Sequence, residues 1–280
     1  MRRTSIVTGG TGGIGKATAV ALAALGDRVL VVGRNPAKAE AAVSDIRRTT
    51  GNEAVELLLC DFGSLASVRS LAAEVLRRYE RVHVLVNNAG AFYPTRALTA
   101  DGFEATFGVN HLAPFLLTNL LLDRLKASAP ARIVNVSSAA HAFPGLDFAD
   151  WQSERGKYRS MRAYAMSKIA NILCTYELAR RLAGTGVTAN CLHPGMVGTD
   201  IFTSQGKSLA ATLTAPLLRP FMLTPAQGAE TSVYLAADPA VEGVTGRYYA
   251  NRRERRSSRR TYDEALARKL WALSERMTAG

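Results

Sequence analysis

The sequence predicts an α/β protein built on a doubly wound parallel sheet of about seven strands with helices on both faces. Short runs rich in valine and isoleucine alternate with longer segments of helical periodicity. Most of these runs are apolar throughout, as expected of parallel strands that are covered on both faces. Strands are expected at Ser5–Thr8, Arg28–Gly33, Ala54–Cys60, Val82–Asn87, Arg132–Ser137, Val187–His193 and Arg247–Ala250. Helices are expected at Ile14–Leu25, Pro36–Arg48, Leu65–Tyr79, Phe103–Lys126, Met161–Leu182, Pro225–Ala236 and Tyr262–Met277.

Length and composition indicate one globular domain over residues 1–280. The chain has 48% hydrophobic and 21% charged residues, which excludes wholesale disorder, and it carries no repeat or linker-like segment. Its three cysteines, Cys60, Cys174 and Cys191, lack the spacing of a zinc site or a disulfide framework, so no metal is expected. The apolar run near the N-terminus is too short for a signal peptide or a membrane anchor. We therefore expect a cytoplasmic protein.

The formal net charge of +12 is partly local. Between Asn251 and Arg260 there are six arginines and one glutamate, a sum of +5, at the start of a C-terminal helical extension over residues 251–280. Such a cluster could contact the phosphates of nucleic acid or of an anionic membrane. Because no aromatic residues are interleaved with the arginines and no nucleic-acid module is recognised, a solvated basic loop is favoured and no nucleic-acid partner is expected.

A glycine-rich segment follows the first predicted strand and opens the first predicted helix. It reads Thr8-Gly9-Gly10-Thr11-Gly12-Gly13-Ile14-Gly15. Glycines allow a tight turn and close approach of a pyrophosphate, while the helix N-terminus supplies free N–H groups and the positive end of the helix dipole. In this context the segment predicts a Rossmann fold that binds a dinucleotide.

The end of the second strand bears on which dinucleotide is bound. The chain reads Val32-Gly33-Arg34-Asn35, without the carboxylate that would bind the ribose 2′-hydroxyl of NAD. A guanidinium at Arg34 can pair with a 2′-phosphate, and Gly33 leaves room for that group. This favours NADP(H) as the cofactor. The alternative is that Arg34 only ends a strand in solvent.

Candidate catalytic residues gather at the carboxyl ends of the strands. Tyr164 and Lys168 are spaced i, i+4, so the phenol and the ammonium share one helix face, and the cation is expected to lower the tyrosine pKa. Ser138 follows the fifth strand and Asn87-Asn88-Ala89-Gly90 ends the fourth. Asn110 lies on the helix between these two strands.

With these motifs in this order, the chain resembles the short-chain dehydrogenase/reductase family. The motifs that carry the resemblance are Thr8 to Gly15, Asp61, Asn87 to Gly90, Asn110, Ser138, Tyr164, Lys168 and Pro194-Gly195. Within the family it most resembles the retinol dehydrogenase and WW-domain oxidoreductase-like branch. The segments that indicate this branch are Asp101 to Glu104, Gly108 to Leu112, Val134 to Ser138, Leu192 to Gly195 and Leu270-Trp271-x-x-Ser274.

The resemblance implies roles for the matching residues. Tyr164 would exchange a proton with the substrate oxygen, Ser138 would hydrogen-bond that oxygen, Lys168 would lower the pKa of Tyr164 and hold the nicotinamide ribose, and Asn110 would keep a water in a proton relay. Asp61 would contact the adenine, Asn88 the adenosine-side ribose and Thr199 the carboxamide. The full set expected at the cofactor is Gly9, Thr11, Gly13, Ile14, Gly15, Arg34, Asp61, Asn88, Ala89, Gly90, Tyr164, Lys168, Pro194, Gly195, Val197 and Thr199.

The substrate pocket is expected to be apolar. An apolar segment at about residues 200–224 corresponds to a lid in the family, and 25 residues separate Ser138 from Tyr164, an insertion that the retinol dehydrogenase branch shares. The candidate pocket residues are Phe92, Tyr93, His141, Phe143 and Phe202. His141 either touches substrate or lies on a surface loop. His193 is expected to be structural and His83 inert.

These features predict an NADP(H)-dependent oxidoreductase that acts on a carbonyl or alcohol of a hydrophobic small molecule, as a ketone or aldehyde reductase. The alternative is a non-catalytic NADP-binding sensor or scaffold. Branch members often carry an N-terminal membrane anchor, and none precedes Ile6, which suggests a lipophilic ketone other than a membrane retinoid. The resemblance also implies a homodimer or homotetramer formed through the helices Phe103–Lys126 and Met161–Leu182.

Overall fold

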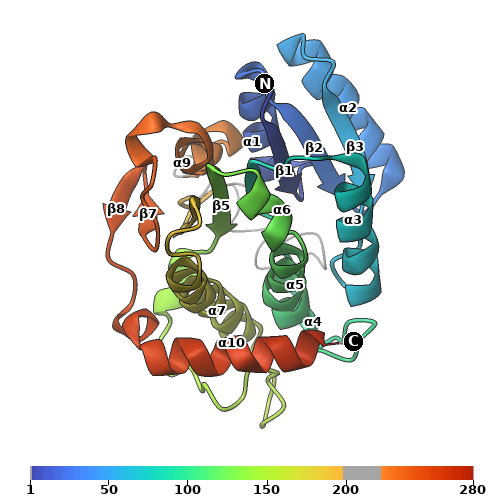
Figure 1. Ribbon diagram of the computed structural model, residues 1–280. Coiled ribbons are helices and arrows are strands. Elements are labelled where there is room, and N and C mark those ends of the chain that lie inside the picture. Colours follow the sequence, from blue (N-terminus) through green and yellow to red (C-terminus); the bar gives the residue numbers. More distant parts are fainter. Residues whose placement is uncertain (1, 198–221, 280) are drawn as a thin grey trace.

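The computed structural model describes residues 2–197 and 222–279, and it contains one eight-stranded sheet in the order β3-β2-β1-β4-β5-β6-β7-β8. The first seven strands are parallel and β8 is antiparallel to β7 (Figure 1). This confirms the doubly wound α/β fold. The strands are β1 (Thr4–Thr8), β2 (Arg28–Gly33), β3 (Val55–Leu59), β4 (Val84–Asn87), β5 (Ala131–Val136), β6 (Val187–Leu192), β7 (Tyr248–Ala250) and β8 (Arg253–Arg255).

The central strand β1 pairs with both β2 and β4, so the direction of winding reverses beside it. Ligands of doubly wound sheets bind in the crevice at such a reversal, beyond the carboxyl ends of the strands. All five residues of β1 are buried. Ile6 faces one hydrophobic cluster and the next residue, Val7, faces the other, as the two-residue period of a strand requires.

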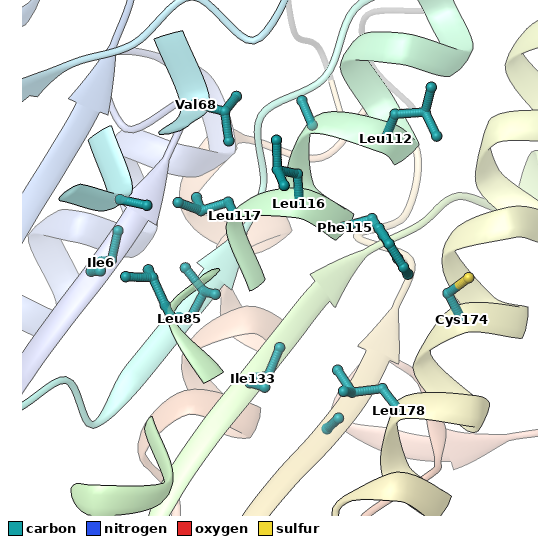
Figure 2. Packing of buried hydrophobic residues seen from close by; sticks show 14 of the residues in the cluster. Ile6, Val68, Leu85, Leu112, Phe115, Leu116, Leu117, Ile133, Cys174 and Leu178 are labelled. Atoms are coloured by element: carbon teal, nitrogen blue, oxygen red, sulfur yellow. The ribbon is translucent and has the colours of Figure 1, made fainter. Parts of the chain in front are cut away.

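Helices cover both faces of the sheet. They are α1 (Gly13–Ala24), α2 (Pro36–Thr50), α3 (Leu65–Arg78), α4 (Ala105–Phe107), the π-turn η1 (Gly108–Leu112), α5 (Ala113–Leu120), α6 (Leu122–Ala127), η2 (Ala139–Ala142), α7 (Ser160–Arg181), α9 (Pro225–Ala237), η5 (Pro239–Val241), η6 (Arg259–Tyr262) and α10 (Glu264–Thr278). Side chains of α1, α2 and α9 belong to the hydrophobic cluster that contains Val7, whereas side chains of α3, α5 and α7 belong to the cluster that contains Ile6. Figure 2 shows Val68 of α3, Leu117 of α5 and Leu178 of α7 on the second of these faces.

The predicted helix Phe103–Lys126 is divided into shorter pieces. It begins only at Ala105, because the Glu104 side chain accepts the first backbone N–H groups of α4 and so caps it. The π-turn follows, and Pro114 comes directly after it. Proline lacks an amide hydrogen and would clash with the carbonyl four residues earlier, which is that of Asn110. The wider π-turn accommodates Pro114 at this point.

The predicted basic loop contains an eighth strand. β8 pairs with β7 through a hairpin in which Ala250 opposes Arg253. Asn251 and Arg252 form the turn with positive φ values of 52° and 58°, the conformation that two-residue hairpin turns favour. All three residues of β8 are exposed, so the segment lacks the apolar alternation that would have predicted a strand.

The C-terminal helix α10 lies across α7 and α5 (Figure 1). Trp271 packs edge-on against Phe115 of α5 at a centroid distance of 4.8 Å, and Arg181 of α7 lies 4.4 Å from the centroid of its ring. Helix α10 therefore buries, within one chain, part of the surface of the helices that were expected to join subunits. Among the described helices, we find none that is both long and apolar enough to cross a membrane.

We predict that Trp271→Ala lowers the free energy of unfolding by about 3–5 kcal/mol, because it removes a buried aromatic ring and leaves a cavity between α10 and α5. Urea unfolding followed by circular dichroism measures this. Lys269→Ala, at an exposed position of the same helix, is the control and should change the value by less than about 0.5 kcal/mol. Equal losses in the two variants would contradict the packing role of Trp271.

Candidate active site

The loop after β1 requires glycine at several positions. Gly9 and Gly13 have φ values of 65° and 51°, in the left-handed region. A Cβ atom on Gly15 would lie 2.2 Å from the carbonyl oxygen of Gly9 and 2.4 Å from Nδ2 of Asn88, so only glycine fits there. Within the described structure, no side chain caps the N-terminus of α1. The loop and this helix end form a cradle that fits the pyrophosphate of a dinucleotide.

Thr8 fastens the glycine loop to the end of β4. Its Oγ1 accepts hydrogen bonds from the backbone N–H groups of Asn88 and Ala89, both at 2.9 Å. The Asn88 side chain donates in return to the carbonyl oxygen of Thr8 at 2.8 Å. Asn88, expected beside the adenosine ribose, therefore braces the loop itself. Thr8 was not among the predicted cofactor residues, although a hydroxyl directly before the glycines and opposite Asn-Asn-Ala-Gly was a usable signal.

Arg34 lies at the carboxyl end of β2 with an exposed guanidinium, 4.0 Å from Oδ1 of Asp61. That carboxylate also accepts the backbone N–H of Gly63 at 2.9 Å. Because the ion pair is exposed, it is weak and leaves Arg34 available to a stronger anion. Gly33 is in contact with Thr11, since a Cβ there would lie 2.3 Å from the Thr11 methyl group. The predicted adenosine-side residues thus lie together at one end of the sheet edge.

The structure brings Ser138, Tyr164 and Lys168 together. Ser138 follows β5, and its side chain forms a hydrogen bond with the Tyr164 hydroxyl. The Lys168 Nζ lies 5.5 Å from the centroid of the Tyr164 ring and donates to the carbonyl oxygen of Val136 at 3.2 Å. Ser137 joins β5 to α7, because its Oγ donates to the carbonyl oxygen of Lys168 at 2.8 Å. This places a phenol, a hydroxyl and an amine at the carboxyl end of β5.

Burial controls the protonation of this group. It raises the pKa of Tyr164, and the hydrogen bond from Ser138 opposes that rise. Burial also lowers the pKa of Lys168 to about 8. The expected lowering of the tyrosine pKa by the neighbouring cation is therefore not found in the protein without ligand, because removal of the phenolate from water outweighs the other effects. Both groups are pushed toward their uncharged forms.

Asn110 lies on the π-turn η1 and ties two elements together. Its Oδ1 accepts the backbone N–H of Ala91 at 2.7 Å, and its Nδ2 donates to the carbonyl oxygen of Ala91 and to Oγ of Ser167, both at 3.0 Å. Ser167 in turn donates to the carbonyl oxygen of Tyr164 at 2.7 Å. The side chain expected to hold a relay water thus holds the loop after β4 against the catalytic helix α7. Ser167 was not among the predicted site residues, because along the sequence it resembles any other helix serine.

Among the predicted pocket residues, Phe92 meets the catalytic tyrosine, with its ring 5.9 Å from that of Tyr164. Phe143 is 44% exposed and lies toward solvent. His141 is buried, and its Nδ1 lies 2.7 Å from the carbonyl oxygen of Ser138, so the surface-loop interpretation was wrong. Burial lowers the pKa of His141, which favours the neutral imidazole.

His193 and His83 each accept a hydrogen bond from a backbone N–H group. The backbone N–H of Gly195 donates to Nδ1 of His193 at 3.0 Å, in keeping with the expected structural role of this histidine. The backbone N–H of Thr4 donates to Nδ1 of His83 at 3.0 Å, so His83, expected to be inert, joins the start of β1 to the chain before β4.

The turn after β6 positions the remaining cofactor candidates. Gly195 has a φ of 86°, and Val197 pairs with Leu223, so the chain segments on either side of residues 198–221 meet there. Thr199, Phe202 and most of the predicted lid lie outside the described residues.

The lowered pKa of Lys168 predicts that burial of this side chain reduces the free energy of unfolding by an amount that depends on pH. Since the folded value of about 8 lies below the unfolded value near 10.4, the penalty is fully present below pH 8 and disappears as the pH rises toward 10.4. We predict that Lys168→Met is more stable than wild type by about 3 kcal/mol at pH 7 and loses this advantage near pH 10.4. Urea unfolding at several pH values measures the difference.

Burial raises the pKa values of the three cysteines, so they also make the free energy of unfolding depend on pH. Their contribution is the same in the variant and the wild type and cancels when the two free energies are subtracted. The control is Lys157→Met at an exposed position, which should track the wild type at every pH. A Lys168→Met advantage that is constant from pH 7 to 10.4 would contradict the burial of a depressed lysine.

Comparison with known proteins agrees with this geometry. The short chain dehydrogenase family model matches residues 3–210. Human retinol dehydrogenase 13 is 44% identical over 278 residues, covering 98% of this chain and 84% of the relative. Human polyprenol dehydrogenase is 45% identical over 284 residues, covering 99% and 85%. A crystal structure of an uncharacterized protein from Mycobacterium paratuberculosis has a TM-score of 0.78 at 36% identity, covering 99% and 93%. The chain therefore belongs to the short-chain dehydrogenase family and, within it, to the branch of the retinol dehydrogenases.

Proposed function

We propose that the protein is an NADP(H)-dependent reductase that converts a ketone or aldehyde group of a hydrophobic small molecule into an alcohol, or carries out the reverse oxidation. The observation that carries the proposal is the meeting of the half-buried Ser138 with the buried Tyr164 and Lys168 at the carboxyl end of β5. It lies on the same sheet edge as the glycine cradle that follows β1. Family membership supports the reaction class, oxidation and reduction.

A nicotinamide cofactor bound along this edge supplies the hydride chemistry. The chain's own residues handle the substrate oxygen and its proton. Ser138 hydrogen-bonds and orients that oxygen, and Tyr164 donates its hydroxyl proton to it. Because the resulting phenolate is buried, it needs a nearby positive charge, and the protonated Lys168 amine, beside the Tyr164 ring, provides one. Asn110 and Ser167 keep α7 at a fixed distance from the loop after β4.

Two observations support NADP(H) as the cofactor. The exposed guanidinium of Arg34 follows a strand end without a carboxylate, where a 2′-phosphate would find a bidentate partner. A putative gluconate 5-dehydrogenase from Beutenbergia cavernae, with a TM-score of 0.71 and 30% identity, was crystallised with NADP; the match covers 89% of this chain and 94% of that one.

Relatives named for retinol and polyprenol, both lipophilic alcohols, support a hydrophobic substrate. A cytoplasmic location and assembly into a homodimer or homotetramer stay predictions.

We predict that Tyr164→Phe lowers kcat for an aldehyde such as all-trans-retinal by roughly 100-fold or more, because the proton donor is lost, while NADPH still binds. Cofactor oxidation followed at 340 nm measures turnover, and quenching of tryptophan fluorescence measures NADPH binding. Full turnover by the variant would contradict the proposal. Tight NADPH binding by the wild type without turnover on a broad carbonyl panel would indicate the sensor or scaffold function instead.

We predict that Arg34→Ala raises the KM for NADPH about tenfold and leaves the KM for NADH within a factor of two, because only NADPH carries the phosphate that the guanidinium would bind. Lys38→Ala, which removes an exposed cation from the neighbouring helix α2, is the matched control for a general loss of positive charge. A tenfold rise for both cofactors, or for neither, would contradict the role of Arg34 as the phosphate reader.

A further inference from the structure

The insertion between Ser138 and Tyr164 is fastened to the loop that follows β4. The Tyr158 hydroxyl lies 3.0 Å from Oε1 of Glu104 and 3.3 Å from the carbonyl oxygen of Tyr93. The backbone N–H of Glu104 donates to Oε1 of Gln152 at 2.8 Å. At the surface, Arg96 and Glu154 add an ion pair at 4.0 Å. Residues 152–158 of the insertion are thus held at several points against residues 93–104.

Glu104 is the centre of these contacts. It has no exposed surface, and its carboxylate accepts the backbone N–H groups of Thr106 at 2.9 Å and Phe107 at 2.8 Å. A buried carboxylate is costly unless donors surround it, and Tyr158 supplies a donor from a different segment of the chain. The Thr106 hydroxyl lies 3.4 Å from the Tyr158 oxygen and can donate to it, while the single Tyr158 proton serves Glu104.

The contact between Tyr158 and Glu104 lies next to the segment that touches the catalytic tyrosine. Tyr93, whose carbonyl oxygen is near the Tyr158 hydroxyl, is adjacent in the chain to Phe92, whose ring meets that of Tyr164. Trp151 of the insertion packs on Phe107 at 5.8 Å, so the insertion is held from a second side. Phe92 and Tyr93 form what we call the pocket wall. Asn110 holds its near end at Ala91, and displacement of Tyr158 would loosen its far end at Tyr93.

We propose that Tyr158, through its hydrogen bond to Glu104, is a positioning residue that holds the pocket wall against Tyr164 and so determines which carbonyl compounds the site accepts. The Phe92 end of the wall lies against Tyr164, where any aldehyde binds, whereas Tyr158 holds the Tyr93 end. A long lipophilic substrate extends to the Tyr93 end and a small aldehyde does not, so a rigid Tyr93 end lowers the entropic cost of binding the long substrate only. The proposal rests on the proposed reductase function and deepens it to substrate selection.

The test compares Tyr158→Phe with Tyr176→Phe, each of which keeps its ring and loses one hydroxyl. Tyr176 is the matched control, because its hydroxyl makes a 2.8 Å hydrogen bond to Ser257 and contacts neither the pocket wall nor the insertion. Steady-state kinetics with NADPH use all-trans-retinal as the long substrate and benzaldehyde as the small one. Hydrogen–deuterium exchange reports on the backbone amides of residues 91–97, and a thermal melt reports on overall stability.

We expect Tyr158→Phe to raise the KM for all-trans-retinal about tenfold with kcat within twofold, to leave benzaldehyde kinetics unchanged, and to speed amide exchange at 91–97 at least tenfold. Tyr176→Phe should change none of these. Equal changes in the kinetics of both substrates would overturn the proposal. So would a Tyr158→Phe variant that has a lower melting temperature, as Tyr176→Phe can have, but an unchanged KM for all-trans-retinal.

If the wild type reduces neither substrate, the proposed function is what fails, and the exchange experiment still decides the positioning role. Exchange at 91–97 that is unchanged in Tyr158→Phe overturns it. Faster exchange confined to that segment supports it.

Discussion

The hydrogen bonds of the Thr8 hydroxyl across the ends of β1 and β4 are the constraint on which the site depends. They hold the first residues after both strands within contact distance, and this proximity is what makes glycine obligatory at position 15. With the two strand ends fixed, the N-terminus of α1 lies at the sheet edge, and no side chain of the described residues caps the N–H groups that would bind a ligand's phosphates. The catalytic group two strands away, beyond β5, is placed relative to the same edge by the parallel register of β4 and β5.

A series of hydrogen bonds between buried polar groups connects this site to the outer helices α7 and α10. Asn110 joins the loop after β4 to α7, and its neighbour His111 contacts Asn171 of α7 and Ser274 of α10. Burial lowers the pKa of His111 to about 4, so it is a neutral hydrogen-bonding group at physiological pH. Because each unmet polar contact in the interior is costly, α10 contributes specificity of packing as well as apolar cover. The π-turn that carries both residues is thereby held on three sides.

The doubly wound parallel sheet could be predicted, because apolar runs alternate with helical segments. The meeting of Ser138 with Tyr164 and Lys168 of α7 was implied by the family resemblance. The π-turn could not, since it depends on Pro114 within an otherwise helical pattern. Strand β8 was missed because its three residues are exposed and arginine-rich, with no apolar face to detect. The contact of Glu104 with Tyr158 joins residues 54 positions apart, and nothing local in either segment signals it.

The expected pKa of Tyr164 was wrong for an instructive reason. Spacing along a helix shows that a lysine can approach a tyrosine, and it implies attraction between ammonium and phenolate. It does not show how much water the fold removes from either group. Both side chains lie within the core of the helix–sheet interface, with Lys168 3% and Tyr164 6% exposed, so desolvation acts on each before their mutual attraction does. At neutral pH the tyrosine is therefore the uncharged phenol, while Lys168, with its pKa lowered only to about 8, still carries its proton. A substrate oxygen that takes the tyrosine proton turns the phenol into an anion, and only then does the full attraction to the lysine develop. The same burial that raises the pKa of Tyr164 also strengthens the attraction between its phenolate and the Lys168 ammonium once the proton has left.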